Sequence, residues 1–556
     1  MATPSLAMIP SAYADSKVYS VLPNNGDGDF TFNRDSSATR VGQNGLIQTV
    51  GFFGSEKVTN GDFATDSDWT KGSTTTISNG QCTFTASGVA QSLIQGNLWA
   101  ANSLSGKTVK LTYTIVSNNL NVTLFRVGGF SGASGFPVTT LNSEVGTHTV
   151  QIVITSSGGT DNAIDFYIQS AATTGALVLD NVSVKEVLGD QPRLNYDISN
   201  GVVQSCPSLL LEPASTNSLL FSEDYTNSVW TSLASGETIV SNSVISPDGT
   251  LNADTLEGNG STTNVYVRQD ITLNTSVDYT FSIFAKKGTN DFLAISAEGF
   301  TGATNTLLIF DLNNSIVTTG TGSIENYGNG WLRCSFTISI STDGTGRFLI
   351  YPAYNGTTRG FPSASDSNGK NIYIWGAQVE ALSYATSYIP TSGASQTRAA
   401  ETCDGAGNAA TFNSTEGVLY VEISALANDQ TNRRITLSDG SNNNRIVTGY
   451  NTTSNQIFYF VVVGSSTVAS GNYTSSDITQ FSKIAIKFKV NDFALWVDGI
   501  ERQTDTSGAI FSANTLSSLQ FEQGSGGALF FYGNTKDIRV YNEALTDAQL
   551  QTLTTL

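Results

Sequence analysis

Hydrophobic and polar residues alternate along most of this chain, in short runs that turn residues separate. The segments KTVKLTYTIV, HTVQIVIT and KIAIKFKV are examples. Because side chains on a strand point alternately to its two faces, a period of two predicts strands that are buried on one face. One short helix is expected near the C-terminus, where Thr546 can cap it and Gln549 occupies the capping-box position.

The densest apolar run lies in the first half of the chain. Residues 209–211 are three leucines, and Glu212 and Pro213 end the run. A short apolar run between turn residues is typical of a strand buried on both faces, and proline stops a helix from continuing. We expect this strand to form the core of a stem and to pair with residues 30–50, where Asn44-Gly45 predicts a hairpin turn.

Length and composition favour several all-β domains. A chain of 556 residues is too long for one hydrophobic core, so about three or four domains are expected. Only 13% of the residues are charged, whereas Gly, Ser, Thr and Asn are abundant, which is typical of short strands and many turns. The net charge of -19 provides no basic patch for phosphate groups, so nucleic acid is not expected as a partner.

The cysteines and the hydropathy bear on the compartment. The four cysteines are far apart in the sequence, which fits neither a disulfide framework nor a zinc site: they are Cys82, Cys206, Cys334 and Cys403. Isolated thiols fit a protein made in a reducing cytoplasm. Ala12-Tyr13-Ala14 has the form of a signal-peptidase site, but no positive segment precedes it, and no run approaches the length of a membrane span. We expect neither a signal peptide nor membrane insertion.

Two stretches resemble bacteriophage tail-fibre and virion-surface proteins. They are DFTFNRDSSATRVGQNGLIQTV, ending at Val50, and PRLNYDISNGVVQSCPSLLLEPASTNSLLFSEDY, starting at Pro192. In that family the first stretch runs almost directly into the second. The resemblance implies a virion location and a domain inserted between the two stretches.

The inserted segment resembles the carbohydrate-binding jelly rolls of the galactose-binding-like class. It opens with NGDF at residues 60–63, followed by Trp69, and closes with LVLDNVSVKEV, within which we expect a bulge or a crossing near Asn181. A second copy is indicated by Glu223-Asp224-Tyr225 followed by Trp230, and by IYIWGAQVEAL at its end.

The C-terminal segment resembles a concanavalin-A-like, laminin-G-like lectin sandwich. The likeness rests on KIAIKFKVNDFALWVDGIE and on the tail DIRVYNEALTDAQLQTL, a strand followed by a short helix. The chain is therefore predicted to be all-β and multi-domain, with two jelly rolls and one concanavalin-A-like sandwich. The predicted parts are an N-terminal stem or attachment segment (1–53), an inserted jelly roll (54–189), the second half of the stem (190–215), a second jelly roll (216–389), a linker (390–400) and the sandwich (401–556).

Residues suited to catalysis are scarce. His148 is the single histidine, and it lies in an alternating stretch typical of a strand. Glycoside hydrolysis needs two carboxylates about 5 to 9 Å apart, but Glu416, Glu422 and Glu522 stand alone among apolar or small neighbours. We expect no enzyme activity, no catalytic residue, no cofactor and no metal site, and a depolymerase is the less favoured alternative.

Sugar binding requires an aromatic ring to stack on a pyranose, with polar groups for its hydroxyls. Trp99 lies in the polar segment GNLWAANS and is the first candidate for an exposed platform, with Trp69 and Trp230 next. The strand tryptophans Trp331, Trp375 and Trp496 are expected to be core residues.

These features predict a bacteriophage virion-surface fibre or appendage that binds host-surface glycans during adsorption. The alternative is a structural capsid or tail decoration protein without a sugar ligand. The expected partners are other virion proteins, gripped through the N-terminal stem and residues 209–211, a host glycan, and further copies of the chain, with a trimer expected.

Overall fold

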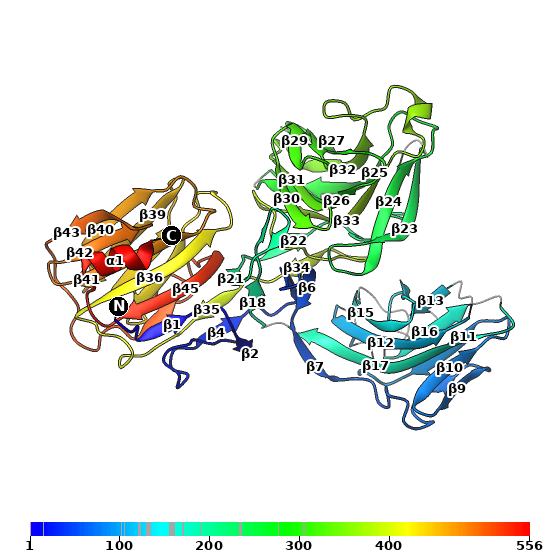
Figure 1. Cartoon of the computed structure of the whole chain (residues 1–556), viewed down its shortest axis with the longest axis horizontal. Helices are drawn as coiled ribbons and strands as arrows, with labels where there is room; N and C mark the ends of the chain where they lie inside the picture. The colour runs from blue at the N-terminus through cyan, green and yellow to red at the C-terminus, as the bar shows by residue number, and fades with distance from the viewer. Residues whose placement is uncertain are drawn as a thin grey trace. The chain divides into compact units, whose positions relative to one another are not determined.

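The computed structural model describes residues 2–14, 16–101, 103–104, 106–120, 124–128, 135–154, 162–169, 172–188, 191–232, 236–275, 277–303 and 306–555. Within these residues the regular elements are β-strands, apart from a 3-10 turn, η1 (Ala364–Ser367), and a C-terminal helix, α1 (Asp547–Thr554) (Figure 1). The predicted all-β, multi-domain fold is confirmed. No helix among the described residues is long and apolar enough to cross a membrane.

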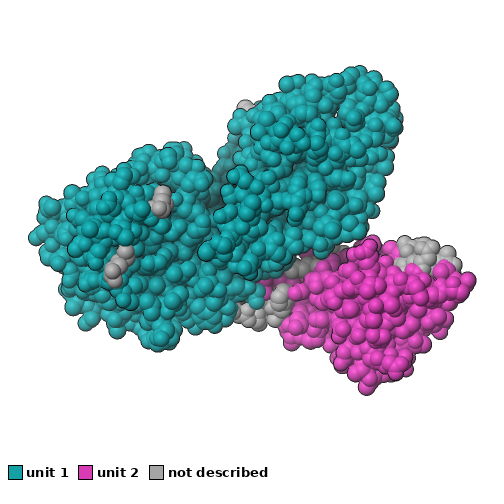
Figure 2. Space-filling model, viewed as in Figure 1, with its two compact units in different colours: residues 1–50, 190–390, 395–556 teal, residues 51–189, 391–394 magenta. Residues whose placement is uncertain are grey.

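The chain forms two compact units (Figure 2). The first comprises Met1–Val50, Asp190–Pro390 and Ser395–Leu556, and the second comprises Gly51–Gly189 with Thr391–Ala394. The second unit is therefore an insertion in the sequence of the first.

The second unit is a jelly roll of two antiparallel sheets. One sheet has the order β15-β12-β17-β10-β9, and β7 pairs with the C-terminal part of β17. The other sheet has the order β14-β13-β16-β11-β8. Leu111, Phe166 and Leu179 are fully buried between them. The strands are β7 (Phe52–Glu56), β8 (Thr70–Lys71), β9 (Thr75–Ser78), β10 (Gln81–Thr85), β11 (Gln91–Gln95), β12 (Thr108–Asn118), β13 (Leu124–Val127), β14 (Thr139–Thr140), β15 (Gly146–Val153), β16 (Ile164–Gln169) and β17 (Ala176–Leu188).

A second jelly roll lies in the first unit. Its sheets have the orders β23-β24-β33-β26-β31-β30 and β25-β32-β27-β28-β29. The strands are β23 (Glu237–Ile245), β24 (Leu251–Gly258), β25 (Val267–Leu273), β26 (Tyr279–Lys287), β27 (Phe292–Glu298), β28 (Leu307–Asp311), β29 (Ile316–Thr319), β30 (Ser323–Gly328), β31 (Trp331–Ile338), β32 (Gly344–Ala353) and β33 (Asn371–Glu380).

The two jelly rolls begin with the same packing device. The indole Nε1 of Trp69 donates to the carbonyl of Asn60 at 3.0 Å, and that of Trp230 donates to the carbonyl of Phe221 at 2.9 Å. Both carbonyls belong to residues with positive φ, 52° and 49°. The opening motif of each module is thus a turn that a buried tryptophan ties to the core.

The closing strands also correspond. The register of β12 against β17 shifts beside Asn181, which has a φ of 51°, and β26 against β33 shifts beside Gly376, which has a φ of 65°. The bulge predicted near Asn181 is confirmed.

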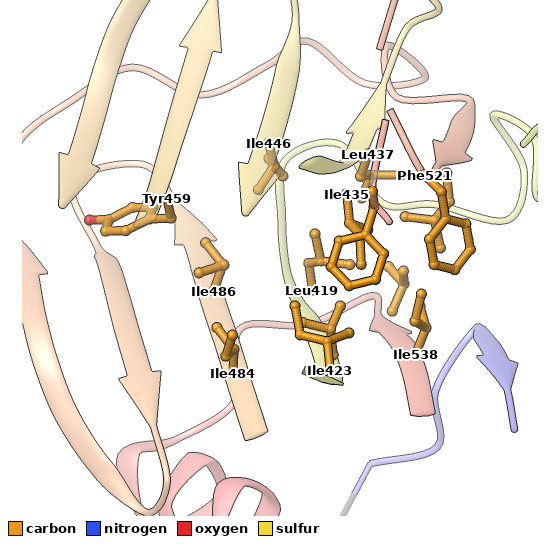
Figure 3. Packing of buried hydrophobic residues seen from close by; sticks show 14 of the residues in the cluster. Leu419, Ile423, Ile435, Leu437, Ile446, Tyr459, Ile484, Ile486, Phe521 and Ile538 are labelled. Carbon is orange, nitrogen blue, oxygen red and sulfur yellow. The ribbon is translucent and has the colours of Figure 1, made fainter. Parts of the chain in front are cut away.

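The C-terminal module is a sandwich whose larger sheet has the order β18-β21-β45-β36-β41-β42-β43, with β1 also on β45. The facing sheet has the order β40-β39-β38-β37-β44. Apolar side chains from the two sheets meet between them, including Leu419, Ile484 and Ile538 from one side and Ile435, Ile446 and Tyr459 from the other (Figure 3).

The strands of the sandwich come from distant parts of the chain: β1 (Leu6–Met8), β18 (Arg193–Asn195), β21 (Ser208–Leu211), β36 (Glu416–Ala425), β37 (Arg433–Ser438), β38 (Arg445–Tyr450), β39 (Gln456–Val463), β40 (Ser466–Thr474), β41 (Ser482–Lys489), β42 (Phe493–Val497), β43 (Ile500–Asp505), β44 (Ser518–Gln520) and β45 (Gly533–Tyr541). Thr546 and Gln549 form the predicted capping box of α1. This helix packs on the larger sheet of the sandwich.

The expectation of a separate stem is wrong. β21, the three-leucine strand, pairs with β18 and β45 and not with residues 30–50. Leu209 and Leu211 face the sandwich core, where Phe30 and Phe32 join them. The reason is that the edge of β45 offers unpaired backbone groups, and pairing there buries all three leucines. Residues 209–211 are therefore not an exposed surface that a virion protein can grip.

Residues 2–50 pack against both modules of the first unit. β2 (Tyr13–Ala14), β3 (Lys17–Val18) and β4 (Phe30–Asn33) form a small sheet with β35 (Thr402–Asp404). β5 (Ala38–Val41) and β6 (Ile47–Val50) form the predicted hairpin at Asn44-Gly45, with Gly45 at a φ of 76°. Ile47 of this hairpin is buried against Phe284 and Trp375 of the second jelly roll. Two further ribbons are β19 (Ile198–Ser199) with β20 (Val202–Val203), and β22 (Ser215–Asn217) with β34 (Gln396–Arg398).

A buried arginine–glutamate network joins these segments. Its members are Arg34, Arg193, Glu212, Arg398 and Glu401, whose side chains are at most 4% exposed. Glu401 accepts from Arg34 Nη1 at 2.8 Å and from Arg193 Nε at 2.8 Å, and it also forms an ion pair with Arg193 Nη2. One carboxylate thus binds side chains that come from both sides of the insertion.

Glu212 is the second anion of the network. It pairs with Arg193 Nη1 at 2.6 Å and with Arg398 Nη1 at 3.0 Å. It also accepts from the amide of Ser387 at 2.8 Å, in the segment that follows the second jelly roll. Burial acts to raise the pKa of Glu212, but Arg398 and Arg193 outweigh burial and lower it to about 2.

The ends of the insertion lie at one member of the network. Arg34 donates to the carbonyl of Val50 at 3.3 Å and to the carbonyl of Gln191 at 2.9 Å. The two ends of the insertion therefore both lie beside the side chain of Arg34.

We predict that the first unit folds without the insertion. Replacing residues 52–188 with a short Gly-Ser linker bridges two points that already lie close together, and it removes no member of the network. Calorimetry of the shortened chain should show a cooperative transition at the temperature of the corresponding transition in the full chain. A broad, non-cooperative transition would show that the insertion contributes to the core of the first unit.

Candidate functional site

A pocket of about 300 Å³ lies on the second jelly roll, on the outer face of the sheet β25-β32-β27. Alternate side chains of these strands, such as Val267, Ile295 and Ile350, fill the core. The residues between them therefore point outward. We name this the tyrosine pocket, and it is lined by Thr262, Asn264, Tyr266, Arg268, Glu298, Arg347, Leu349, Tyr351 and Arg359.

Two aromatic rings form the apolar part of the tyrosine pocket. The ring centroids of Tyr266 and Tyr351 are 5.2 Å apart, at an angle of 53°. Tyr351 is 2% exposed and rests on a small apolar cluster with Ala294 and Leu349, whereas Tyr266 is half-buried. Tyr351 is thus the floor, and the ring of Tyr266 remains open to a ligand.

Charged groups surround the rings. The guanidinium of Arg359 lies 5.0 Å from the centre of the Tyr351 ring and forms an ion pair with Glu298. The hydroxyl of Tyr351 donates to Glu298 Oε1 at 3.5 Å, and burial raises the pKa of this tyrosine. Arg347 stands opposite Asp270 on one neighbouring strand and Glu298 on the other.

One polar group of the pocket is unsatisfied. Arg268 Nη1 is buried and has no hydrogen-bond partner within the described part of the chain. Arg268 Nε is 3.8 Å from a carboxylate oxygen of Asp270 and 3.4 Å from Thr231 Oγ1. A buried donor without a partner favours a ligand oxygen at this position.

This arrangement suits a saccharide. An open tyrosine ring can stack on the apolar face of a pyranose, and guanidinium, amide and hydroxyl groups can bind its hydroxyls. The pocket volume is within the lower range of small-molecule sites.

The three tryptophans predicted to bind sugar lie elsewhere. Trp99, Trp69 and Trp230 are 9%, 7% and 6% exposed, and none of them lines the tyrosine pocket. The expectation that Trp99 is an exposed platform is wrong, because its ring packs 6.3 Å from that of Phe136 in the core of the inserted jelly roll. Trp331, Trp375 and Trp496 are buried, as predicted.

The signal that the sequence analysis missed is aromatic alternation. Tyr266, just before β25, and Arg268 within it are two residues apart and point outward, as do Leu349 and Tyr351 on β32. An aromatic or arginine at such positions is exposed unless another element covers it, but their pairing across strands is visible only in the fold.

The three acidic residues singled out in the sequence lie in different surroundings. Glu416 pairs with Lys489 at 2.9 Å, and Glu522 Oε1 accepts from the amides of Gly524 and Gly526. Glu422 of β36 lies opposite Asp537 of β45. The sequence does not indicate this pairing, because 115 residues separate the two acids. Lys483 and Arg539 flank this acid pair, so it belongs to a ladder of balanced charges.

His148 Nε2 lies 2.8 Å from the carbonyl of Glu144.

Glu223 is the most perturbed acid of the second jelly roll. It accepts from Tyr388 Oη at 3.0 Å and from Asn252 Nδ2 at 3.1 Å. Burial, followed by the charge of Asp248, raises its pKa to about 8.

Among the described residues there is no group of three or more His, Cys, Asp and Glu side chains that could hold a metal ion.

Comparison with known proteins finds one family model that is similar to the sandwich. Residues 420–551 match the model of the Concanavalin A-like lectin/glucanases superfamily. The concanavalin-A-like fold predicted for the C-terminal module is thereby confirmed. No curated protein sequence matches the chain.

Several solved structures are similar to parts of the chain. The CBM40 domain of a Ruminococcus gnavus IT-sialidase, bound to α2,3-sialyllactose, is 12% identical, with 27% of this chain and 93% of that chain covered and a TM-score of 0.24. Domain 4 of a GH43 extracellular arabinanase from Geobacillus stearothermophilus, in complex with arabinotriose, is 12% identical, with 31% and 84% covered and a TM-score of 0.23.

The N-terminal CBM22-1-CBM22-2 tandem domain of Paenibacillus barcinonensis Xyn10C is also 12% identical, with 60% of this chain and 98% of that chain covered and a TM-score of 0.22. We draw nothing about ligands from these three structures, because all the TM-scores are below 0.5.

We predict that Glu223→Gln stabilises the first unit at neutral and mildly alkaline pH. The pKa of Glu223 is about 8 in the folded chain against an ordinary value of 4.5. Between these values the folded state binds more protons than the unfolded state, so the stability due to this group is present below pH 4.5 and is lost as the pH rises through 8. Glutamine carries no such proton, and because Glu223 is half-buried we expect a gain of about 1 kcal/mol.

The measurement is urea unfolding of both proteins at pH 5 and pH 8 (about 0.5 units above the lower and near the upper pKa). The variant should lose less stability than the wild type between the two pH values. Equal losses would contradict the raised pKa.

Proposed function

We propose that this chain binds glycans through the tyrosine pocket and serves as a surface component of a bacteriophage virion during host adsorption. The observation that carries the proposal is the open ring of Tyr266 beside a buried, unsatisfied Arg268 donor. A ring and a set of directed donors are what a saccharide requires, and this combination has no evident role in the stability of the jelly roll.

The virion location is supported by sequence alone. Residues 30–50 and 192–222 resemble bacteriophage tail-fibre and virion-surface proteins, and the net charge of -19 suits a soluble surface protein. Because residues 209–211 are buried, contacts with other virion proteins must use another surface of the first unit.

Three further properties belong to this proposal. The chain acts as an adhesin without hydrolysing its glycan, since Glu416 is paired with Lys489, Glu522 accepts from backbone amides, and Lys483 and Arg539 flank the acids Glu422 and Asp537. It is made in the host cytoplasm and carried on the virion surface. It assembles as a homo-oligomer, with a trimer expected, because joined copies raise weak single-site affinity by about 10²–10⁴.

We predict that Tyr266→Ala weakens glycan binding at least about tenfold, which corresponds to ~1.4 kcal/mol. The substitution removes the stacking surface and leaves the floor, Tyr351, in place. The measurement is a glycan array with the full-length protein, followed by titration calorimetry with the saccharide that binds best.

Tyr19→Ala is the matched control, because Tyr19 is 40% exposed and lies outside the pocket. This variant should bind as the wild type does. Unchanged affinity in Tyr266→Ala would exclude the tyrosine pocket as the binding site. Absence of binding to every glycan would favour a structural decoration protein instead.

A further inference from the structure

The guanidinium groups of two arginines lie against neighbouring phenylalanine rings on the outer face of the sandwich. Arg434 of β37 lies with its guanidinium 5.9 Å from the ring centre of Phe458 and 5.5 Å from that of Phe460, both on β39. Arg445 of β38 lies 5.2 Å from the ring centre of Phe460. We name Arg434 and Arg445 the arginine pair.

The register of the sheet explains how Arg434 reaches the rings. Arg434 is opposite Gly449, and Gly449 is opposite Phe458. Because Gly449 has no side chain, the guanidinium of Arg434 can cross the intervening strand. The two phenylalanine rings are nearly parallel, at 22°, and their centroids are 5.8 Å apart. The rings hold the guanidinium groups in place by cation–π contacts.

The arginine pair differs from several other arginines of the chain in its ion pairing. Neither arginine has an ion-pair partner among the described residues, and the Nε atoms of both are buried without a hydrogen-bond partner there. The adjacent Arg433 is different, since it pairs with Asp429 at 2.8 Å. The chain has 46 acidic and 27 basic residues, yet neither arginine of the pair has an acid within ion-pair distance among the described residues.

Burial disfavours the charged forms of both arginines. Burial, and then the charge of Arg445, lowers the pKa of Arg434, and burial also lowers the pKa of Arg445. Glu522 is the acid that favours the charged form of Arg445; its Oε1 accepts from two backbone amides, and its Oε2 is buried without a hydrogen-bond partner among the described residues. An added anion would relieve the repulsion between the two guanidinium groups.

Polar side chains and backbone groups surround Arg445. Arg445 donates to Asn442 Oδ1 and, at 2.6 Å, to the carbonyl of Gln523. Asn442 Nδ2 donates to Ser525 Oγ at 3.0 Å. Amide and hydroxyl groups of this kind bind sugar hydroxyls, and they extend the site beyond a single anion.

We propose that the arginine pair binds a carboxylate or sulfate group carried by a sugar of an acidic glycan. Guanidinium groups bind both anions through paired N–H donors. The net charge of -19 disfavours long polyanions such as nucleic acid, whereas a single acidic sugar needs only the local positive charge. The choice of a sugar rests on the proposed glycan-binding function, but the site is separate from the tyrosine pocket.

The test uses the full-length protein and three probes. Tetragalacturonate carries carboxylates, its methyl ester is neutral, and a sulfated galactose tetrasaccharide carries sulfate alone. We expect one or both acidic probes to bind at least about tenfold more tightly than the methyl ester, and to bind less tightly as NaCl is raised. The acidic probe that binds identifies the anion.

The double variant Arg434→Gln, Arg445→Gln should lose that tenfold preference and keep its unfolding temperature. Arg502→Gln is the matched control, because Arg502 also lies over one aromatic ring, 4.1 Å from the centre of Tyr473, and it should bind as the wild type does. Equal binding of all three probes by the wild type would contradict the proposal, as would a preference that the double variant retains.

The variant Tyr266→Ala separates this proposal from the proposed function. It should retain the preference for the acidic probe. If Tyr266→Ala loses that preference and the arginine double variant keeps it, the acidic sugar binds in the tyrosine pocket: the proposed function then stands, and the role of the arginine pair is refuted.

Discussion

The buried arginine–glutamate network is the interaction on which the first unit depends. Transferring an ion from water to a protein interior costs several kcal/mol, so the five charges are tolerable only because each one is paired and hydrogen-bonded. Arg193 binds both carboxylates, Glu212 and Glu401, and so connects every branch of the network. Its members come from before the insertion, from after it, and from the segment between the second jelly roll and the sandwich. The sandwich and the jelly roll are thus joined by polar contacts that require all these segments at once.

This constraint also explains how the chain accommodates a whole inserted domain. Arg34 binds the carbonyls on both sides of the insertion, so the surrounding fold does not need the intervening residues to bring its parts together. The two candidate binding surfaces, the tyrosine pocket and the arginine pair, then lie on different modules of the same unit. Sites held by one unit can engage one glycan chain together, which raises affinity without stronger individual contacts.

Local patterns predicted local features well. Alternation predicted the strands, Asn44-Gly45 the hairpin, the change of face near Asn181 the bulge, and Thr546 with Gln549 the helix cap. Each of these is decided by residues that are neighbours in the sequence. The repeated opening motif was detectable for the same reason, and the structure gives its meaning: the tryptophans of both copies are buried anchors and not sugar platforms.

Long-range features could not be predicted in this way. The leucines of β21 pair with β45, more than 300 residues away, and nothing near them in the sequence selects that partner over residues 30–50. The network has the same character, because Glu401 is an ordinary acid until the fold places Arg34 and Arg193 beside it. Polarity alone placed Trp99 at the surface, but the packing of Phe136 against it decides its burial.

The most direct test of this account is calorimetry of the full chain with Arg193→Met. The substitution leaves Glu212 and Glu401 buried without their shared partner, so we expect the first unit to lose about 3–5 kcal/mol of stability and to unfold at a lower temperature. The transition of the second unit should not move. The control Lys489→Ala breaks a pair whose side chains are 46% and 32% exposed, and because solvent screens such a pair it should leave the transition of the first unit almost unmoved. An unchanged transition of the first unit in Arg193→Met, or a loss no larger than that of Lys489→Ala, would contradict the central role of the network.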